Sequence, residues 1–204
     1  IIDLLEGKIF QTQETIIENM NTMFWADGTG NGGKDWEGIQ SLVSGSTVGD
    51  INPGAAGNAF WAPTQTNQGG VLSLAGMASM YNTISVGNDQ PTIIFARQQG
   101  YEAYEALLTG QIRYSDTDMA DGGFQNLLFK GAPITFDSDS NLDGKMFFLN
   151  TKYLQLVAHS DVWFKPTPFV RPTNQDAVFS QLLCYGELTV SNRARQGMIY
   201  ALSD

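Results

Sequence analysis

The chain has very few of the side chains that build disulfides and metal cages. Its 204 residues include one cysteine, Cys184, and one histidine, His159. One cysteine cannot form an internal disulfide, and zinc sites normally use several cysteine or histidine ligands. Cys184 lies in an apolar run over residues 182–185, so we expect it to be buried by packing. A disulfide scaffold and a multi-histidine metal centre are therefore excluded.

Charge is also scarce, and most of it is negative. Charged residues make up 16% of the chain, against about 25% in an average protein. Eleven Lys and Arg stand against twenty-one Asp and Glu, which gives a net charge of −10. The basic residues are scattered, and no cluster of them could hold a phosphate backbone tightly. A strong nucleic-acid binder is therefore excluded, whereas a low charge count is typical of the cores of protein–protein interfaces.

Long apolar runs are missing as well. No run approaches about 18 residues, so the sequence predicts no transmembrane helix and no membrane partner. No secretory signal is visible. Because the chain begins at Ile1 rather than Met, we expect an upstream piece to be missing. With 42% hydrophobic and 11% aromatic residues the chain can still build a core, and disorder is not expected.

The spacing of apolar residues predicts four helices. A long amphipathic helix is expected over residues 2–25, ended by the glycine-rich residues 27–33. A short helix capped by Asp35 follows, and its apolar side chains should point inward. Two more helices are expected near residues 68–86 and over residues 98–108.

Short apolar runs bounded by turn residues predict the strands. They are expected over residues 92–96, 124–129, 132–136, 146–149 and 198–202, with a long hairpin over residues 177–192. Lys130-Gly131 and Gly186-Glu187 are the expected hairpin turns. Helices and strands mix without a regular βαβ rhythm, so the predicted fold class is α+β.

One glycine-rich segment imitates a nucleotide site. Residues 28–34 match the pattern G-x-x-x-x-G-K, but Asp35 stands where a Ser or Thr hydroxyl would bind magnesium. A phosphate-binding loop also follows a buried strand, whereas a helix is expected to precede this one. We interpret the segment as a flexible connection between two helices, and we predict no nucleotide cofactor.

A second segment imitates half of a calcium loop. Asp139, Asn141, Asp143 and Gly144 occupy positions 1, 3, 5 and 6 of an EF-hand, but position 12 is Asn150 instead of a bidentate Glu. Asx residues and Gly also favour an ordinary turn. We predict a turn without structural calcium, and weak adventitious calcium is the alternative.

Catalytic signals are weak. His159 has a carboxylate nearby, Asp161, but no evident nucleophile. Asp116, Asp118 and Asp121 could imitate the carboxylate pair of a glycosidase, although that chemistry depends on a separation in space that spacing along the chain does not give. We therefore assign no catalytic, cofactor-binding or metal-binding residue. A hydrolase that acts on carbohydrate through clustered loop acids is kept as an alternative.

Several stretches carry a resemblance along the whole chain. They are residues 24–31 (FWADGTGN), 113–117 (RYSDT), 123–127 (GFQNL), 129–134 (FKGAPI), 148–154 (FLNTKYL), 185–192 (YGELTVSN) and 196–197. In this order they resemble the major capsid (coat) proteins of tailed bacteriophages and their prophage-encoded relatives.

The resemblance implies the shell fold that phage coats share with encapsulins. Residues 1–44 and 174–192 would form a peripheral domain, built on the long helix and the long hairpin. Residues 45–173 and 193–204 would form an axial domain, with a central sheet flanked by helices. The N-terminal arm and the extended loop of the family would be absent from this chain.

The resemblance also implies a function. The full-length protein would be a structural subunit, not an enzyme, and would assemble as hexamers and pentamers into an icosahedral head around packaged DNA. It would bind that DNA without sequence specificity, with a scaffolding protein and a portal as further partners. It would lie in the virion, and in the bacterial cytoplasm during assembly. A non-viral nanocompartment shell is the other alternative.

Assembly surfaces are expected at two places. The helix over residues 2–25 and the hairpin over residues 177–192 should supply one lateral surface, and loops within residues 46–63 and 110–122 should meet at symmetry axes. Without the arm and the extended loop, we expect this chain to be a monomer or a small oligomer.

Overall fold

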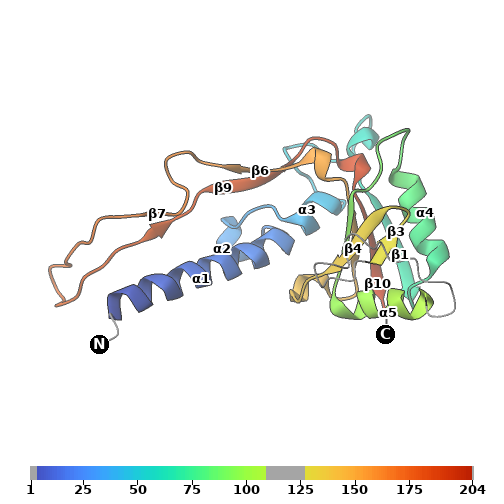
Figure 1. Ribbon diagram of the computed structural model, residues 1–204. Coiled ribbons are helices and arrows are strands. Elements are labelled where there is room, and N and C mark those ends of the chain that lie inside the picture. Colours follow the sequence, from blue (N-terminus) through green and yellow to red (C-terminus); the bar gives the residue numbers. More distant parts are fainter. Residues whose placement is uncertain (1–3, 109–126, 204) are drawn as a thin grey trace.

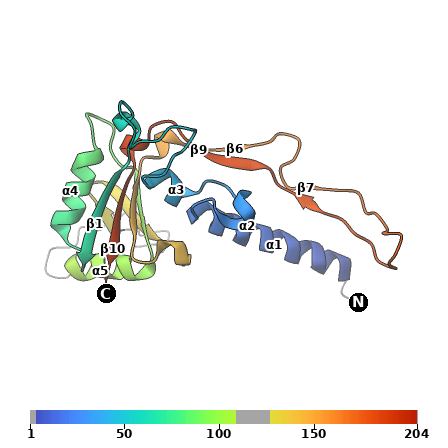
Figure 2. The same cartoon turned by 180° about the vertical axis from the view of Figure 1, so that it is seen from behind.

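The computed structural model describes residues 4–108 and 127–203. Helices pack on a six-stranded sheet to form a compact part, and a long extension projects from it (Figure 1). The extension consists of the helix α1 (Leu4–Trp25) and an antiparallel ribbon of four short strands. The strands of the ribbon are β6 (Leu154–Ala158), β7 (Lys165–Pro166), β8 (Leu182–Leu183) and β9 (Gly186–Val190). Seen from behind, α1 and the ribbon leave the compact part in the same general direction (Figure 2).

The sheet of the compact part is mixed, with the strand order β1-β10-β5-β2-β4-β3. In that order the strands are Thr64–Gly70, Gly197–Leu202, Met146–Leu149, Ile93–Ala96, Ala132–Phe136 and Leu127–Phe129. β1 runs parallel to β10 and β2 runs parallel to β4, while the other neighbours are antiparallel. This arrangement confirms the predicted α+β class.

An apolar cluster lies on each face of the sheet, and successive residues of a strand contribute to opposite clusters because their side chains point to opposite sides. In the central strand β5, Met146 and Phe148 join an apolar cluster with α4 (Leu74–Ile84) and α5 (Gln98–Leu108). Phe147 and Leu149 join a second cluster, which contains Trp25 at the end of α1 and the buried residues of α3 (Ile39–Val43). The second cluster is thus the part of the core that holds the extension.

Short elements connect these larger ones. They are α2 (Gly30–Gly33), η1 (Ala59–Trp61), η2 (Ser140–Leu142), η3 (Thr151–Tyr153) and η4 (Arg193–Arg195). The helices over residues 2–25 and 98–108 and the strands β2, β4, β5 and β10 confirm the predictions within a few residues. The Lys130-Gly131 turn is confirmed too, because both residues have positive φ and β3 pairs with β4 around them. Residues 124–126 of that hairpin lie outside the described residues.

The helix predicted near residues 68–86 is partly wrong. Residues 64–70 form the edge strand β1, and α4 begins only at Leu74, where the Ser73 hydroxyl accepts the Gly76 N–H at 3.1 Å. β1 has the sequence TQTNQGG, which carries no alternating apolar residue to reveal a strand. The predicted cap Asp35 is wrong as well, because α3 begins after Gly38 and has no side-chain cap.

The hairpin predicted over residues 177–192 is also wrong. β9 pairs with β6 and β8 pairs with β7, so the partner strands come from residues 154–166. Gly186 lies opposite Ala158 within a strand and not in a turn. A Cβ at Gly186 would lie 2.9 Å from the Trp163 ring and 3.0 Å from the Val157 carbonyl oxygen. Close packing, and not a chain reversal, therefore requires glycine here.

Candidate assembly interface

Exposed apolar side chains gather on the extension. Helix α1 exposes Leu5, Ile9, Phe10 and Ile17, each between 47% and 64%. The ribbon and the loop that closes it expose Leu156, Val157, Phe169, Val170, Val178, Phe179 and Tyr185. Apolar surface gathered in this way is typical of a site that binds a protein, a membrane or a ligand.

Helix α1 is exposed along most of its length. Trp25 is the one fully buried residue among positions 5–25, and most other positions are exposed. An isolated amphipathic helix gains most of its stability by packing its apolar face. α1 packs on the second apolar cluster near its C-terminal end, and most of its apolar face remains exposed.

An open groove runs between α1 and the ribbon. It has a volume of about 760 Å³. Leu5 and Ile9 line it from the helix, while Phe164, Phe169 and Val178 are among the residues that line it from the ribbon. The groove continues the exposed apolar surface of the extension, so both belong to one candidate interface.

A set of contacts, called the junction here, fixes the extension to the compact part. The junction residues are Trp25, Trp36, Glu37, Gly38, Asp137, Trp163, Gly186, Glu187 and Arg193. Trp25 is 2% exposed, lies edge-on to Phe95 with ring centres 4.9 Å apart, and donates its indole N–H to Asp137 at 3.3 Å. The end of α1 is thus held by both apolar packing and a charge-assisted hydrogen bond.

Arg193 is the most deeply buried charged group of the junction. It is fully buried, and its guanidinium donates to the main-chain oxygens of Leu42 (2.8 Å), Ser46 (2.9 Å), Ser41 (3.2 Å) and Ser44 (2.5 Å). Five N–H donors in a fixed fork suit such a carbonyl cluster, which a lysine could not satisfy. Arg193 therefore fixes the chain that leaves α3.

The base of the ribbon rests on the segment between α2 and α3. Trp36 stacks on Trp163, with ring centres 6.2 Å apart and planes 13° apart. The Glu37 N–H donates to the Glu187 carboxylate at 2.8 Å. Both contacts join residues that are far apart in the chain, so sequence patterns did not reveal them. The direction of the ribbon is set here.

Of the residues weighed as catalytic, the structure describes His159 and Asp161. His159 is exposed, and its Nδ1 accepts the Asp161 N–H at 3.2 Å. Asp116, Asp118 and Asp121 lie outside the described residues. Cys184 is half-buried rather than buried, because it lies on the thin ribbon instead of in the core. Across residues 4–108 and 127–203, no group of three or more His, Cys, Asp or Glu side chains could hold a metal ion.

The two segments that resemble ligand loops match their predictions to different degrees. The segment over residues 28–35 follows the helix α1 and not a strand, as predicted, but it contains the one-turn helix α2 where an irregular connection was expected. In the other loop the Asp139 carboxylate accepts the Asn141 N–H at 2.8 Å and the Asn141 side-chain amide at 2.9 Å, which confirms a turn. That neither loop binds a nucleotide or calcium stays a prediction.

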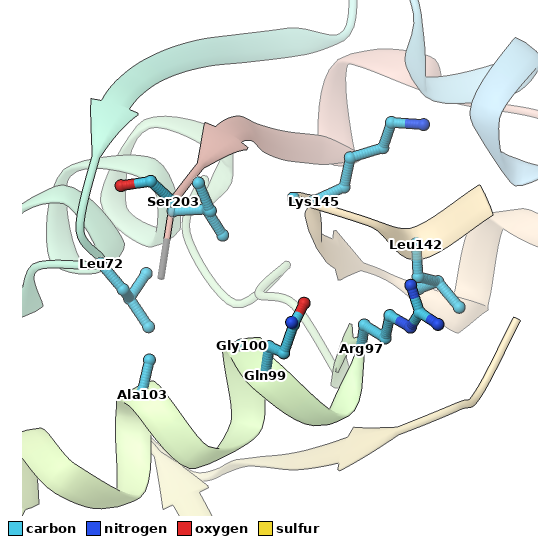
Figure 3. A pocket seen from close by; sticks show the side chains of 10 residues that line it. Leu72, Arg97, Gln99, Gly100, Ala103, Leu142, Lys145 and Ser203 are labelled. Atoms are coloured by element: carbon cyan, nitrogen blue, oxygen red, sulfur yellow. The ribbon is translucent and has the colours of Figure 1, made fainter. Parts of the chain in front are cut away.

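A small cavity lies between α5 and the end of β10 (Figure 3). It holds about 40 Å³, room for a few water molecules, whereas ligand pockets span about 300–1,000 Å³. Leu72 and Ala103 line it, and Arg97 at its rim pairs with Asp143.

Lys145 also lines this cavity. Burial lowers the pKa of the Lys145 ammonium, while the negative charge of Asp27 raises it. The Lys145 ammonium donates to Gln40 and to the Asn141 carbonyl at 2.9 Å each, which is a structural role.

No helix in the described part of the chain is long and apolar enough to cross a membrane.

The sequence was compared with protein families, curated proteins and solved structures. No protein-family model matches the sequence, and no curated protein matches it. Solved structures do match its fold. The capsid of cyanophage A-1(L) superimposes with a TM-score of 0.67 at 14% identity, over 98% of this chain and 70% of that one.

Two other shells match nearly as well. The holo-SrpI encapsulin complex of Synechococcus elongatus PCC 7942 gives a TM-score of 0.61 at 14% identity, and the capsid of a native GTA particle gives 0.61 at 10% identity. The chain is covered to 98% in both, and it spans 66% of either partner chain. These matches confirm the shell fold shared by phage capsids and encapsulins. The matched structures are shell proteins and not enzymes.

Proposed function

We propose that the chain is a structural subunit of an icosahedral phage head, which self-assembles into the shell around a packaged DNA genome. The observation that carries this proposal is the extension, whose exposed apolar side chains project on two long elements away from a folded core. A monomer gains nothing from such a surface, whereas a shell covers it with neighbouring subunits. The shell folds that the chain resembles support the proposal.

The proposed division of labour follows the two parts of the molecule. We assign α1 and the whole ribbon to the peripheral domain, and the six-stranded sheet with its helices to the axial domain. This moves residues 154–173 from the axial to the peripheral side, because β6 pairs with β9. The loop over residues 46–63 stays on the axial side, where it would meet symmetry-related copies.

The acidic composition suits a shell that encloses DNA. A net charge of −10 leaves no basic groove to hold the packaged genome against the wall. DNA would therefore be a contained partner and not a bound ligand. Hexamers and pentamers of this subunit, a scaffolding protein and a portal are the proposed protein partners, first in the bacterial cytoplasm and then in the virion.

Electron microscopy of the full-length protein, expressed in bacteria, tests the proposal. We expect closed shells. The double variant Phe10→Ser with Phe179→Ser removes apolar side chains from both elements of the extension, and should abolish shells without lowering Tm, since both side chains are exposed. Val71→Ser is the matched control, because Val71 is equally exposed but lies off the extension. Shells of the double variant at wild-type yield would overturn the assignment of the interface.

A nanocompartment shell is the second candidate, and the encapsulin match favours it as much as the GTA match favours a capsid. The contents of purified shells distinguish the two. DNA protected from nuclease indicates a phage head, whereas a packaged protein in its place indicates a nanocompartment. The carbohydrate hydrolase has no supporting observation within the described residues.

A further inference from the structure

One long segment of the compact part carries no charge. Residues 51–88 contain no Asp, Glu, Lys, Arg or His, so all twenty-one acidic and all eleven basic residues of the chain lie outside this segment. It folds into η1, β1, α4 and the turn over residues 85–88, and the exposed surface of these elements is called the uncharged face here. In both views β1 and α4 lie on the side of the compact part that is turned away from the extension (Figure 1 and Figure 2).

The outer side of α4 differs from that of an ordinary surface helix, which presents charged as well as polar side chains to water. The exposed side chains of α4 include Ala75, Ser79 and Asn82, and none of its eleven positions is charged. The helix α5 packs on the same apolar cluster and carries Glu102 and Glu105. The lack of charge is therefore specific to α4 and is not required of a helix that covers this side of the sheet.

The uncharged face also has features that invite a second protein chain. Phe60 of η1 is 65% exposed, and Val86 in the turn after α4 is 54% exposed. β1 is the edge strand of the sheet, with a register shift between Asn67 and Gly70. It contains neither charge nor proline, which normally keep another chain away from an exposed edge. The apolar side chains and the unprotected edge together favour a contact with protein.

The charges around the uncharged face favour another copy of this acidic chain as that protein. Lys130 donates to the Asn82 side chain at 2.6 Å, and Arg195 donates to a carbonyl at the end of α4 at 3.4 Å. The Asp89 carboxylate, which follows the segment, is paired with Lys152 at 2.8 Å. Two copies with a net charge of −10 repel each other, but at physiological salt only charges within about 8 Å act strongly. A second copy therefore meets little repulsion at a face without charge that has basic side chains beside it.

We propose that the uncharged face is a second interface, against which another copy of this chain packs. The inference rests on the proposed function, because a subunit of a closed shell meets neighbours on more than one side. The extension supplies contacts on one side of the molecule, and the uncharged face lies on the other (Figure 1). The absence of charge is the property on which this contact depends.

Adding one charge to the face tests the proposal. Ser79→Glu places a carboxylate on the exposed side of α4. In the full-length protein this variant should lower the yield of shells in electron micrographs by about tenfold or more, with Tm unchanged. Ser79→Gln has the same size without the charge, and should assemble far better than Ser79→Glu. Gln99→Glu adds the same charge to the exposed side of α5 and should give shells at wild-type yield.

A cross-linker at position 79 identifies the partner without relying on shell formation. A photoreactive amino acid in place of Ser79 in the full-length protein, irradiated in the bacterial cells, should give a covalent product of twice the subunit mass. The same amino acid in place of Gln99 is the control and should give much less of it.

The two experiments together decide the inference. Shells of Ser79→Glu at wild-type yield would overturn it, and so would a cross-link from position 79 to a different protein, or to none, in place of a second copy. If the wild-type full-length protein forms no shells, the proposed function fails, while the cross-link still decides whether copies meet at the uncharged face.

Discussion

Replacing Gly38 by alanine should destabilise the protein, because α1 and α3 touch at this residue. The backbone of Gly38 has φ −78° and ψ −178°, which alanine adopts without strain. A Cβ there would nevertheless meet the carbonyl oxygens of Met23, Phe24 and Ala26, that of Phe24 at 2.7 Å. Main-chain oxygens at a helix end cannot rotate away as a side chain can. The end of α1 must therefore move away from α3.

The size of the loss follows from two opposing effects. Forcing one extra carbon into a packed contact costs about 1–3 kcal/mol, and a contact with backbone belongs at the upper end. Restricting the unfolded chain by a Gly-to-Ala change returns about 0.4–1 kcal/mol. The net loss is about 2 kcal/mol, which lowers Tm by about 4–8 °C for a chain of this length.

Thermal unfolding followed by circular dichroism measures this loss. Gly7→Ala is the matched control, because Gly7 lies within α1 and a Cβ there would meet nothing within 4 Å. Alanine is the better helix former by about 1 kcal/mol, so this variant should be as stable as the wild type or more stable. A Gly38→Ala protein that melts at or above the wild-type temperature would refute the steric argument.

Three other predictions concern single residues or loops. Arg193→Met leaves the main-chain oxygens at the end of α3 without their donor, and should lower the free energy of unfolding measured in urea by about 3 kcal/mol or more. Arg193→Lys should recover less than half of this loss, because an ammonium cannot reach all of these oxygens. A loss below about 1 kcal/mol in Arg193→Met would contradict the prediction. Excess EDTA should leave Tm unchanged, and a fall of several degrees that calcium alone restores would count against the turn over residues 139–144. Calorimetric titration with Mg-ATP should give no heat, whereas micromolar affinity lost on Lys34→Ala would establish a nucleotide site at residues 28–35.

Elements with a strong local pattern could be predicted from the sequence. The helix α1 and the strand β5 are examples, because the apolar spacing of the first and the run MFFL of the second depend on near neighbours in the chain. The edge strand β1 could not be predicted in the same way. Its seven polar and glycine residues pair with β10, more than 120 positions away, and only that partner makes them a strand.

The candidate interface was predicted in part. Residues 2–25 were expected to form a lateral surface, and α1 does expose an apolar face. The second element was placed too late in the chain, because Gly186 was interpreted as a turn residue. Its actual constraint is the ring of Trp163, which is close only in the folded molecule. Arg193 gave no signal, since its partners are main-chain oxygens that carry no sequence identity.

If the proposed function holds, the junction matters for assembly although none of its contacts belongs to the exposed apolar face of the extension. Helix α1 has 22 residues and is therefore a lever of about 33 Å. A tilt of about 5° at its base moves its far end by about 3 Å, while apolar atoms lose contact beyond about 4.5 Å. A shell repeats each contact in every subunit, so such an error recurs around the whole particle. In the proposed shell, Gly38, Arg193 and the hydrogen bond from the Glu37 N–H to Glu187 would thus determine whether the exposed side chains of neighbouring copies can meet.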